Sequence, residues 1–179
     1  IGQVAMEVEE LLKQRVQGRN NFQGVDLSGK DLSNTYLVGV NFSGAKLVET
    51  NFRGANLAAS NLSEANLSKA DLSDANLDEV KLTKANLTEA NLSSAVLIGV
   101  NLSQTNLSGA NLTRVNLHLS CLSAANLSEA NLQFAKLGWV NLGEVNLTGA
   151  DLRNVDLNGV SLNGAKLVGA ILPNGAIHS

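Results

Sequence analysis

The stretch ANLSKADLSDANLDEVKLTK, residues 65–84, places a leucine at every fifth residue from Leu67 to Leu82. The same interval runs through most of the chain: from Phe22 to Leu172, every position in this series holds Leu or Phe. Nothing interrupts the series. A repeat this regular has to be explained before any other feature of the 179-residue chain.

Each five-residue unit has the same layout around its central Leu or Phe. Two residues before the centre, at the small position, the chain from Val25 to Ala170 always holds Ala, Val, Ser or Thr, with Lys30 as the exception. One residue before the centre, at the amide position, more than half of the units hold Asn, and Asp is the next most frequent residue. Most glycines stand two residues after the centre, at the corner position. Stacked Asn side chains at the amide position would form ladders between neighbouring coils.

An ordinary helix or strand cannot carry this pattern. In an α-helix each residue advances by about 100°, so a five-residue step would rotate successive leucines by about 140° and scatter them around the helix. In a flat strand, an odd step sends successive side chains to opposite faces. The chain must therefore turn once per unit. The central and small residues then point into a narrow interior, and the Asn or Asp between them points outward or along the wall.

Units such as Ala65–Lys69 and Ala150–Asn154 resemble the motif of the pentapeptide-repeat proteins. The resemblance implies an all-β fold, a right-handed quadrilateral β-helix in which four units form each coil. It predicts a repeat domain of seven to eight coils over residues 21–174, followed by a tail over residues 175–179. The ending Pro173–His178 is similar to that of cyanobacterial members, so a bacterial and cyanobacterial origin is expected.

The N-terminal segment has a different pattern. Residues from Val4 to Val16 carry apolar side chains at helical spacing, separated by charged residues, and predict an amphipathic helix. Gly18 supplies a stop, and the acidic residues mostly precede the basic ones, which suits the helix dipole. We therefore expect residues 1–20 to cap the first coil, whose end would otherwise expose unpaired backbone groups. The alternative is a helix that binds a partner or a membrane surface.

The composition argues against several classes of function. With a formal charge of −3, the chain has no basic excess, so direct nucleic-acid binding is not expected. Two histidines, His118 and His178, and one cysteine, Cys121, are too few for a ligand set or a nucleophile with its base, so we expect no enzyme activity, metal or cofactor. No window approaches the roughly 18 consecutive apolar residues of a membrane span. A cytoplasmic location is expected, with the periplasm or thylakoid lumen as alternatives if a leader was removed.

A candidate interaction surface follows from the length of the coil. Residues 20 apart stack in columns, and six outward residues that are large, aromatic or basic fall on neighbouring columns: Ile98, Arg114, His118, Leu119, Phe134 and Trp139. Because aromatic residues and Arg are favoured anchors of protein interfaces, we expect a protein partner here. In the alternative interpretation, Phe134 and Trp139 fold over the corner to shield the backbone, and Arg114 packs on the Phe134 ring.

The C-terminal end lacks a helix, and its last coil is expected to be short of cover. An uncovered apolar end favours self-association, so a homodimer is expected through this end. The residues expected to form this contact are Ile171, Leu172, Pro173 and Ile177.

The preferred function is a non-catalytic protein-interaction module, compatible with regulation, that presents a rigid β-helical surface. The second hypothesis is mimicry of DNA, because some members of the family are understood to bind DNA gyrase in this way. Mimicry requires aligned negative charge, but the column from Glu49 to Glu129 contains Lys69, and the column from Glu64 to Glu144 contains Lys84. Acidic side chains only slightly outnumber basic ones over residues 21–179, which ranks mimicry below interaction. A purely structural solenoid is the third hypothesis.

Overall fold

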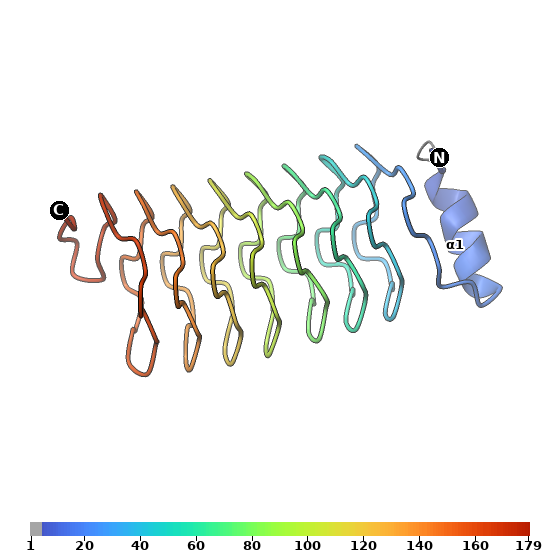
Figure 1. Ribbon diagram of the computed structural model, residues 1–179. Coiled ribbons are helices and arrows are strands. Elements are labelled where there is room, and N and C mark those ends of the chain that lie inside the picture. Colours follow the sequence, from blue (N-terminus) through green and yellow to red (C-terminus); the bar gives the residue numbers. More distant parts are fainter. Residues whose placement is uncertain (1–4) are drawn as a thin grey trace.

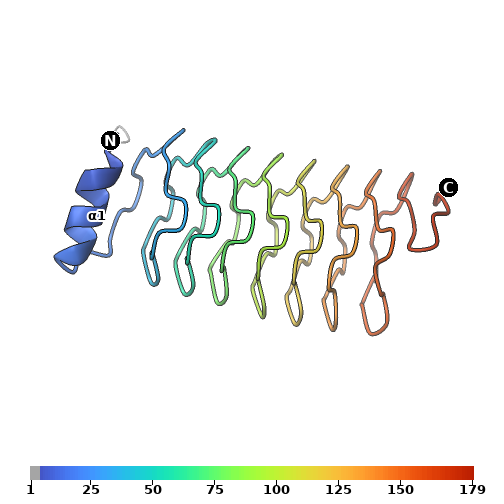
Figure 2. The same ribbon diagram turned by 180° about the vertical axis from the view of Figure 1, so that it is seen from behind.

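The computed structural model is a stack of coils with a single helix at one end and the C-terminal tail at the other (Figure 1). Residues 5–179 are described, and within them the helix, α1, spans Val8–Val16. The view from behind shows the coils following one another without an inserted loop (Figure 2).

Parallel bridges between residues 20 apart join each coil to the next. Asn66 pairs with Asn86, and Asn86 pairs in turn with Asn106, so one column of amide positions runs along the stack. Three further columns run in the same way, which gives the coil the four sides that the resemblance implies. Each bridge is a single residue pair. The sides are therefore one-residue ladders within the described part of the chain, and extended strands do not form there.

Each unit ends in a tight turn that redirects the chain. The N–H of a small residue donates to the carbonyl of the preceding central residue, as from Ala70 to Leu67 at 3.0 Å. The corner residue has positive φ in most turns, and many of these residues, from Asn34 to Asn154, are not Gly. Among the described residues, none of these non-Gly corners is β-branched, because a branched side chain clashes with the backbone in this conformation.

The interior of the stack is filled by the central and small residues. All central residues from Phe22 to Leu152 are buried, and almost all small residues along the same span are buried as well. Where a small residue with a hydroxyl group is buried, that group bonds to the coil below: Thr50 Oγ1 donates to the Leu27 carbonyl at 2.8 Å. The hydroxyl is thereby satisfied inside an apolar core.

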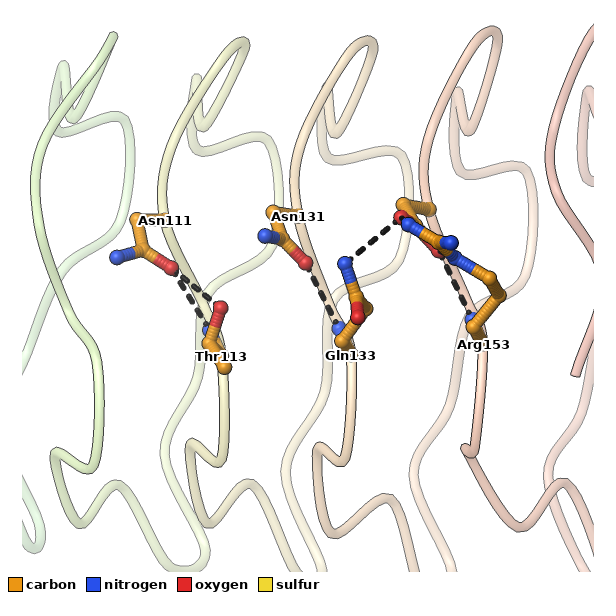
Figure 3. Close-up of polar contacts among 6 residues, drawn as sticks. Asn111, Thr113, Asn131, Gln133 and Arg153 are labelled. Carbon is orange, nitrogen blue, oxygen red and sulfur yellow. Dashed lines mark hydrogen bonds and ion pairs between the residues drawn. The ribbon is translucent and has the colours of Figure 1, made fainter.

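The amide positions form a polar layer outside this core. The Oδ1 atom of Asn111 accepts from the N–H of Thr113 at 3.1 Å, and that of Asn131 accepts from the N–H of Gln133 at 3.0 Å (Figure 3). The expected ladder between coils is confirmed, for example where Asn111 Nδ2 donates to Asn91 Oδ1 at 3.0 Å. The abundance of Asn thus serves the backbone turns and the stacking of coils.

The same column carries a charged group one coil before its last bridged residue, Ile171. Asp151 accepts a bond of 2.9 Å from Gln133 Nε2 of the neighbouring coil and one of 2.6 Å from Arg153 Nη2 (Figure 3). The hydrogen bonds from the Arg153 side chain favour the ionised carboxylate and lower the pKa of Asp151.

The N-terminal helix is shorter than predicted and begins at Val8. Ala5 instead forms a parallel bridge with Asp26, and the N–H of Met6 donates to the Asp26 carbonyl at 3.1 Å, so the segment before α1 extends the ladder. Leu11 is fully buried, and α1 lies over the core of the first coil. Val4, the first residue of the predicted helix, lies outside the described residues.

The C-terminal tail folds back over part of the last coil, whereas the sequence led us to expect an end with little cover. Ile171 and Ile177 form an antiparallel bridge, and the N–H of Leu172 donates to the Ala176 carbonyl at 2.8 Å. The cover is incomplete, because the central residues Leu157 and Leu162 remain partly exposed.

The positive φ of the corner residues can be tested at Ser94, which has φ 59. A β-branched residue is disfavoured in this conformation and Gly is not. Ser94→Val should therefore lower the free energy of unfolding by about 1–2 kcal/mol relative to Ser94→Gly. Thermal or denaturant unfolding followed by circular dichroism measures the difference. Equal stability of the two variants would show that the corner conformation is not maintained in solution.

Candidate interaction surface

The six residues of the predicted surface, here called the Trp139 patch, lie along one side of the stack and on the corner that precedes it, over three consecutive coils. Val96, Asn116 and Lys136 form successive bridges along this side and hold the three coils in register. The patch consists of Ile98 in the first coil, Arg114, His118 and Leu119 in the second, and Phe134 and Trp139 in the third.

Two side chains of the patch contact other parts of the chain: one contacts another patch residue and one contacts a glycine of the next coil. The guanidinium carbon of Arg114 lies 5.7 Å from the centre of the Phe134 ring, which is a cation–π contact. The imidazole of His118 lies over Gly138, where a Cβ atom would stand only 2.6 Å from Nδ1. The intramolecular contact of the alternative interpretation is therefore present, and it accounts for part of the packing of Phe134.

Trp139 and Leu119 are more exposed than Phe134. Trp139 is 71% exposed and Leu119 is 59% exposed. The Trp139 ring rests by one edge on the next coil, where a Cβ at Gly159 would lie 3.6 Å from its Cε3 atom. The core is filled by Leu and small residues, and the one Trp of the chain lies outside it. Filling of the core therefore does not explain why this position holds Trp.

The backbone at these residues makes their exposure more unusual. Leu119, Phe134 and Trp139 all occupy corner positions, with φ of 61, 59 and 58. Most other corners hold Gly or a polar residue, which suits an exposed position of positive φ. Large apolar side chains add conformational cost at such a place and bury little area in return, so their presence is a functional hint.

Along this side and its preceding corner, the charged side chains in the three coils of the patch are basic. Arg114 and Lys136 are both exposed, and neither belongs to an ion pair among residues 5–179. Acidic residues of the same side lie in the coils beyond the patch: Asp78, whose Oδ1 accepts from the N–H of Ile98 at 3.0 Å, is one coil nearer to α1, and Asp156 is one coil nearer to the C-terminus. An incoming surface would meet apolar groups with cations beside them.

The acidic columns elsewhere on the stack are interrupted, as the sequence predicts. Lys69 Nζ lies 3.8 Å from Glu89 Oε2 in the column that begins at Glu49. A cation placed between two carboxylates reduces the negative field that a DNA mimic needs.

The residues predicted for the dimer end separate into two groups. Ile171, Leu172 and Pro173 are partly buried, whereas Ile177 is 72% exposed on the folded-back tail. The homodimer stays a prediction.

A cleft between α1 and the first coil was not foreseen from the sequence. It has a volume of about 430 Å³ and is lined by Leu12, Arg15, Val16, Thr35 and Tyr36. The signal that could have revealed it is Tyr36, an exposed aromatic at an amide position where Asn or Asp is usual.

The described part of the chain contains no group of three or more His, Cys, Asp or Glu side chains able to hold a metal ion. None of the helices described within residues 5–179 has both the length and the apolar character needed to cross a bilayer.

The coil, its four ladders and its outward-facing polar layer define a solenoid of five-residue repeats. The chain belongs to the pentapeptide repeat family: the family model of pentapeptide repeats matches in eight copies, over residues 21–54, 50–89, 90–128, 122–143 and 135–172. Members of this family form right-handed quadrilateral β-helices, which agrees with the four-sided coils observed here.

Several solved structures are similar to this chain. HetL, a pentapeptide repeat protein from the cyanobacterium Nostoc sp. strain PCC 7120 that is involved in heterocyst differentiation regulation, is 29% identical, with a TM-score of 0.58 over 97% of this chain and 100% of HetL. Another Nostoc PCC 7120 pentapeptide repeat protein is 25% identical, with a TM-score of 0.38 over 93% of this chain and 100% of its own. QnrB1, a plasmid-mediated fluoroquinolone resistance protein, is 20% identical, with a TM-score of 0.32 over 79% of this chain and 90% of its own. A search of curated proteins found no match.

The exposed residues of the patch should be dispensable for folding. Because Trp139 is mostly exposed, Trp139→Ala should change the free energy of unfolding by less than about 1 kcal/mol. Leu117→Ala, a buried change on the same side, should cost about 2–5 kcal/mol. Unfolding of both variants by denaturant measures the contrast. A loss for Trp139→Ala as large as that for Leu117→Ala would make Trp139 a structural residue.

Proposed function

We propose that this protein is a non-catalytic interaction module that docks a protein partner on the Trp139 patch. The observation that carries the proposal is the exposure of Leu119, Phe134 and Trp139 at corner positions, where the fold needs only small or polar side chains. Burial of this apolar surface against a partner would be favourable, and central aromatic residues commonly dominate such interfaces.

A regulatory role is supported by the likeness to HetL. That protein is involved in heterocyst differentiation regulation, and its structure corresponds to nearly the whole of this chain. A rigid solenoid gives regulation a simple physical means, because it holds a set of side chains at fixed spacing without further ordering when a partner binds.

The chemistry of the patch also restricts the partner. Arg114 and Lys136 flank the apolar residues and have no carboxylate partner within the described residues. The partner surface should therefore be apolar at its centre and acidic at its rim. Attraction between these charges would steer association and would weaken as the ionic strength rises.

Affinity capture from a cyanobacterial lysate tests this proposal. The wild-type protein is compared with a Phe134→Ala, Trp139→Ala double variant and with Tyr36→Ala, which removes an exposed aromatic from the far end of the same side. We expect a protein that is retained by the wild type and by Tyr36→Ala but lost from the double variant. The retained protein is then purified and its affinity measured at two salt concentrations, where the weaker binding should be at the higher salt.

Equal retention by all three forms would place the function away from the patch. A gyrase supercoiling assay with the wild-type protein provides the test of DNA mimicry. Inhibition that persists in the double variant would replace the proposed function by mimicry, since the acidic residues of the stack are unchanged in that variant.

A further inference from the structure

The repeat register continues into the tail, although the tail does not follow the coil. Counting from Leu172 by five places Ile177 at a central position, Gly175 at a small position and Ala176 at an amide position. In this register residues 175–179 form one more unit, and it would stack on the unit centred at Leu157, one coil earlier.

The tail instead makes an antiparallel turn away from that place. The Ala176 carbonyl accepts from the N–H of Leu172 at 2.8 Å, and the His178 carbonyl accepts from the N–H of Gly169 at 2.8 Å. In the register of the repeat the same two carbonyls would serve Leu157 and Gly159. Ile177, an apolar residue at a central position, is left exposed on the surface.

The unit that would receive the tail is weakly held. Among the described amide positions from Asn21 to Ile171, only Asp156 takes part in no bridge. Its counterpart one coil earlier, Lys136, is bridged to Asn116 on its other side. Elsewhere, an Asp and a Lys at successive amide positions pair closely: Asp26 Oδ2 lies 3.2 Å from Lys46 Nζ.

The tail leaves the register because the positive φ of its turn is shifted by one residue. In a regular corner the second residue after the centre has positive φ, but after Leu172 this conformation falls one residue later, at Gly175, with φ 85. Asn174 could also adopt it, because Pro followed by Asn suits the two inner positions of a type II turn. The observed arrangement corresponds to a hairpin loop closed by a left-handed Gly. The segment Pro173–Gly175 is therefore compatible with both paths.

We propose that residues 175–179 form a two-position strap: folded back, as in this structure, or docked as a further unit of the coil on the segment 156–159. In the docked position the N–H groups of Leu157 and Gly159 donate to the carbonyls of Ala176 and His178. Ile177 then packs over Leu157 in the core.

Docking of the strap also restores the interrupted ladder. Pressed inward by Ile177, the unit centred at Leu157 comes into line with the coil below, so that Asp156 meets Lys136 as Asp26 meets Lys46. Gly159, on which the Trp139 ring rests, moves with this unit. The strap thus changes the support of Trp139 whether or not the patch binds a partner, and it does not rest on the proposed function.

Two Val substitutions distinguish the folded-back strap from the docked strap, because each disfavours one of the two. Gly175→Val disfavours the folded-back path, because a β-branched residue is strained at φ 85, whereas Val is common at the small position that residue 175 takes in the docked unit. Asn174→Val disfavours the docked path, which needs positive φ at residue 174. Both changes lie in the tail and leave the coils intact.

Amide hydrogen exchange followed by NMR in the full chain is the measurement. In Gly175→Val the exchange of the Leu157 and Gly159 amides should slow by about tenfold or more relative to Asn174→Val, because each amide gains a hydrogen bond. Nuclear Overhauser contacts between the methyl groups of Ile177 and Leu157 should be present in Gly175→Val alone. Equal exchange at Leu157 and Gly159 in the two variants, or slower exchange in Asn174→Val, would overturn the strap.

Discussion

The backbone ladder between coils is the interaction on which the rest of the structure depends. Apart from Lys136 and Asp156, amide positions 20 residues apart in the described chain pair from coil to coil, which gives each paired unit a fixed place on one of four sides. This spacing can be kept only if each unit turns by the same amount, which accounts for the recurrent corner with positive φ. It also requires an interior of constant width, which a Leu or Phe and one small residue per unit fill.

Because of this constraint, inward and outward positions have different roles. The inward residues are almost interchangeable from coil to coil and carry little information about function. Outward residues are limited only by the corner conformation and by stacking on their neighbours. The large apolar side chains of Leu119, Phe134 and Trp139 therefore cannot be attributed to packing of the core. The contact between Arg114 and Phe134 explains only part of the reason for placing these two side chains there.

Much of the fold could be predicted from the sequence, because the interval between leucines excludes helices and flat strands and the family resemblance supplies the number of sides. The columns of the Trp139 patch follow from the length of the coil. The start of the helix and the path of the tail were harder to predict. The helix begins at Val8 because Ala5 pairs with Asp26, a contact distant in sequence, and the tail reverses because the positive φ falls on Gly175, one residue after the regular corner position. The cleft beside Tyr36 depends on how α1 lies on the first coil, which no periodicity describes.

The central claim is that the position of side chains around the coil, and not the repeat itself, determines what the protein binds. Insertion of a copy of Ala65–Asp74, two complete units, rotates everything beyond it by half a turn without disturbing the inward pattern. Placed after Glu129, the copy moves Phe134 and Trp139 to the side opposite Leu119; placed after Asp74, it leaves the patch whole. Binding of the captured partner to both insertion variants should be measured by titration, with circular dichroism to confirm that each is folded. The account predicts that binding survives the insertion after Asp74 and is lost with the insertion after Glu129. Equal binding by the two folded variants would contradict it.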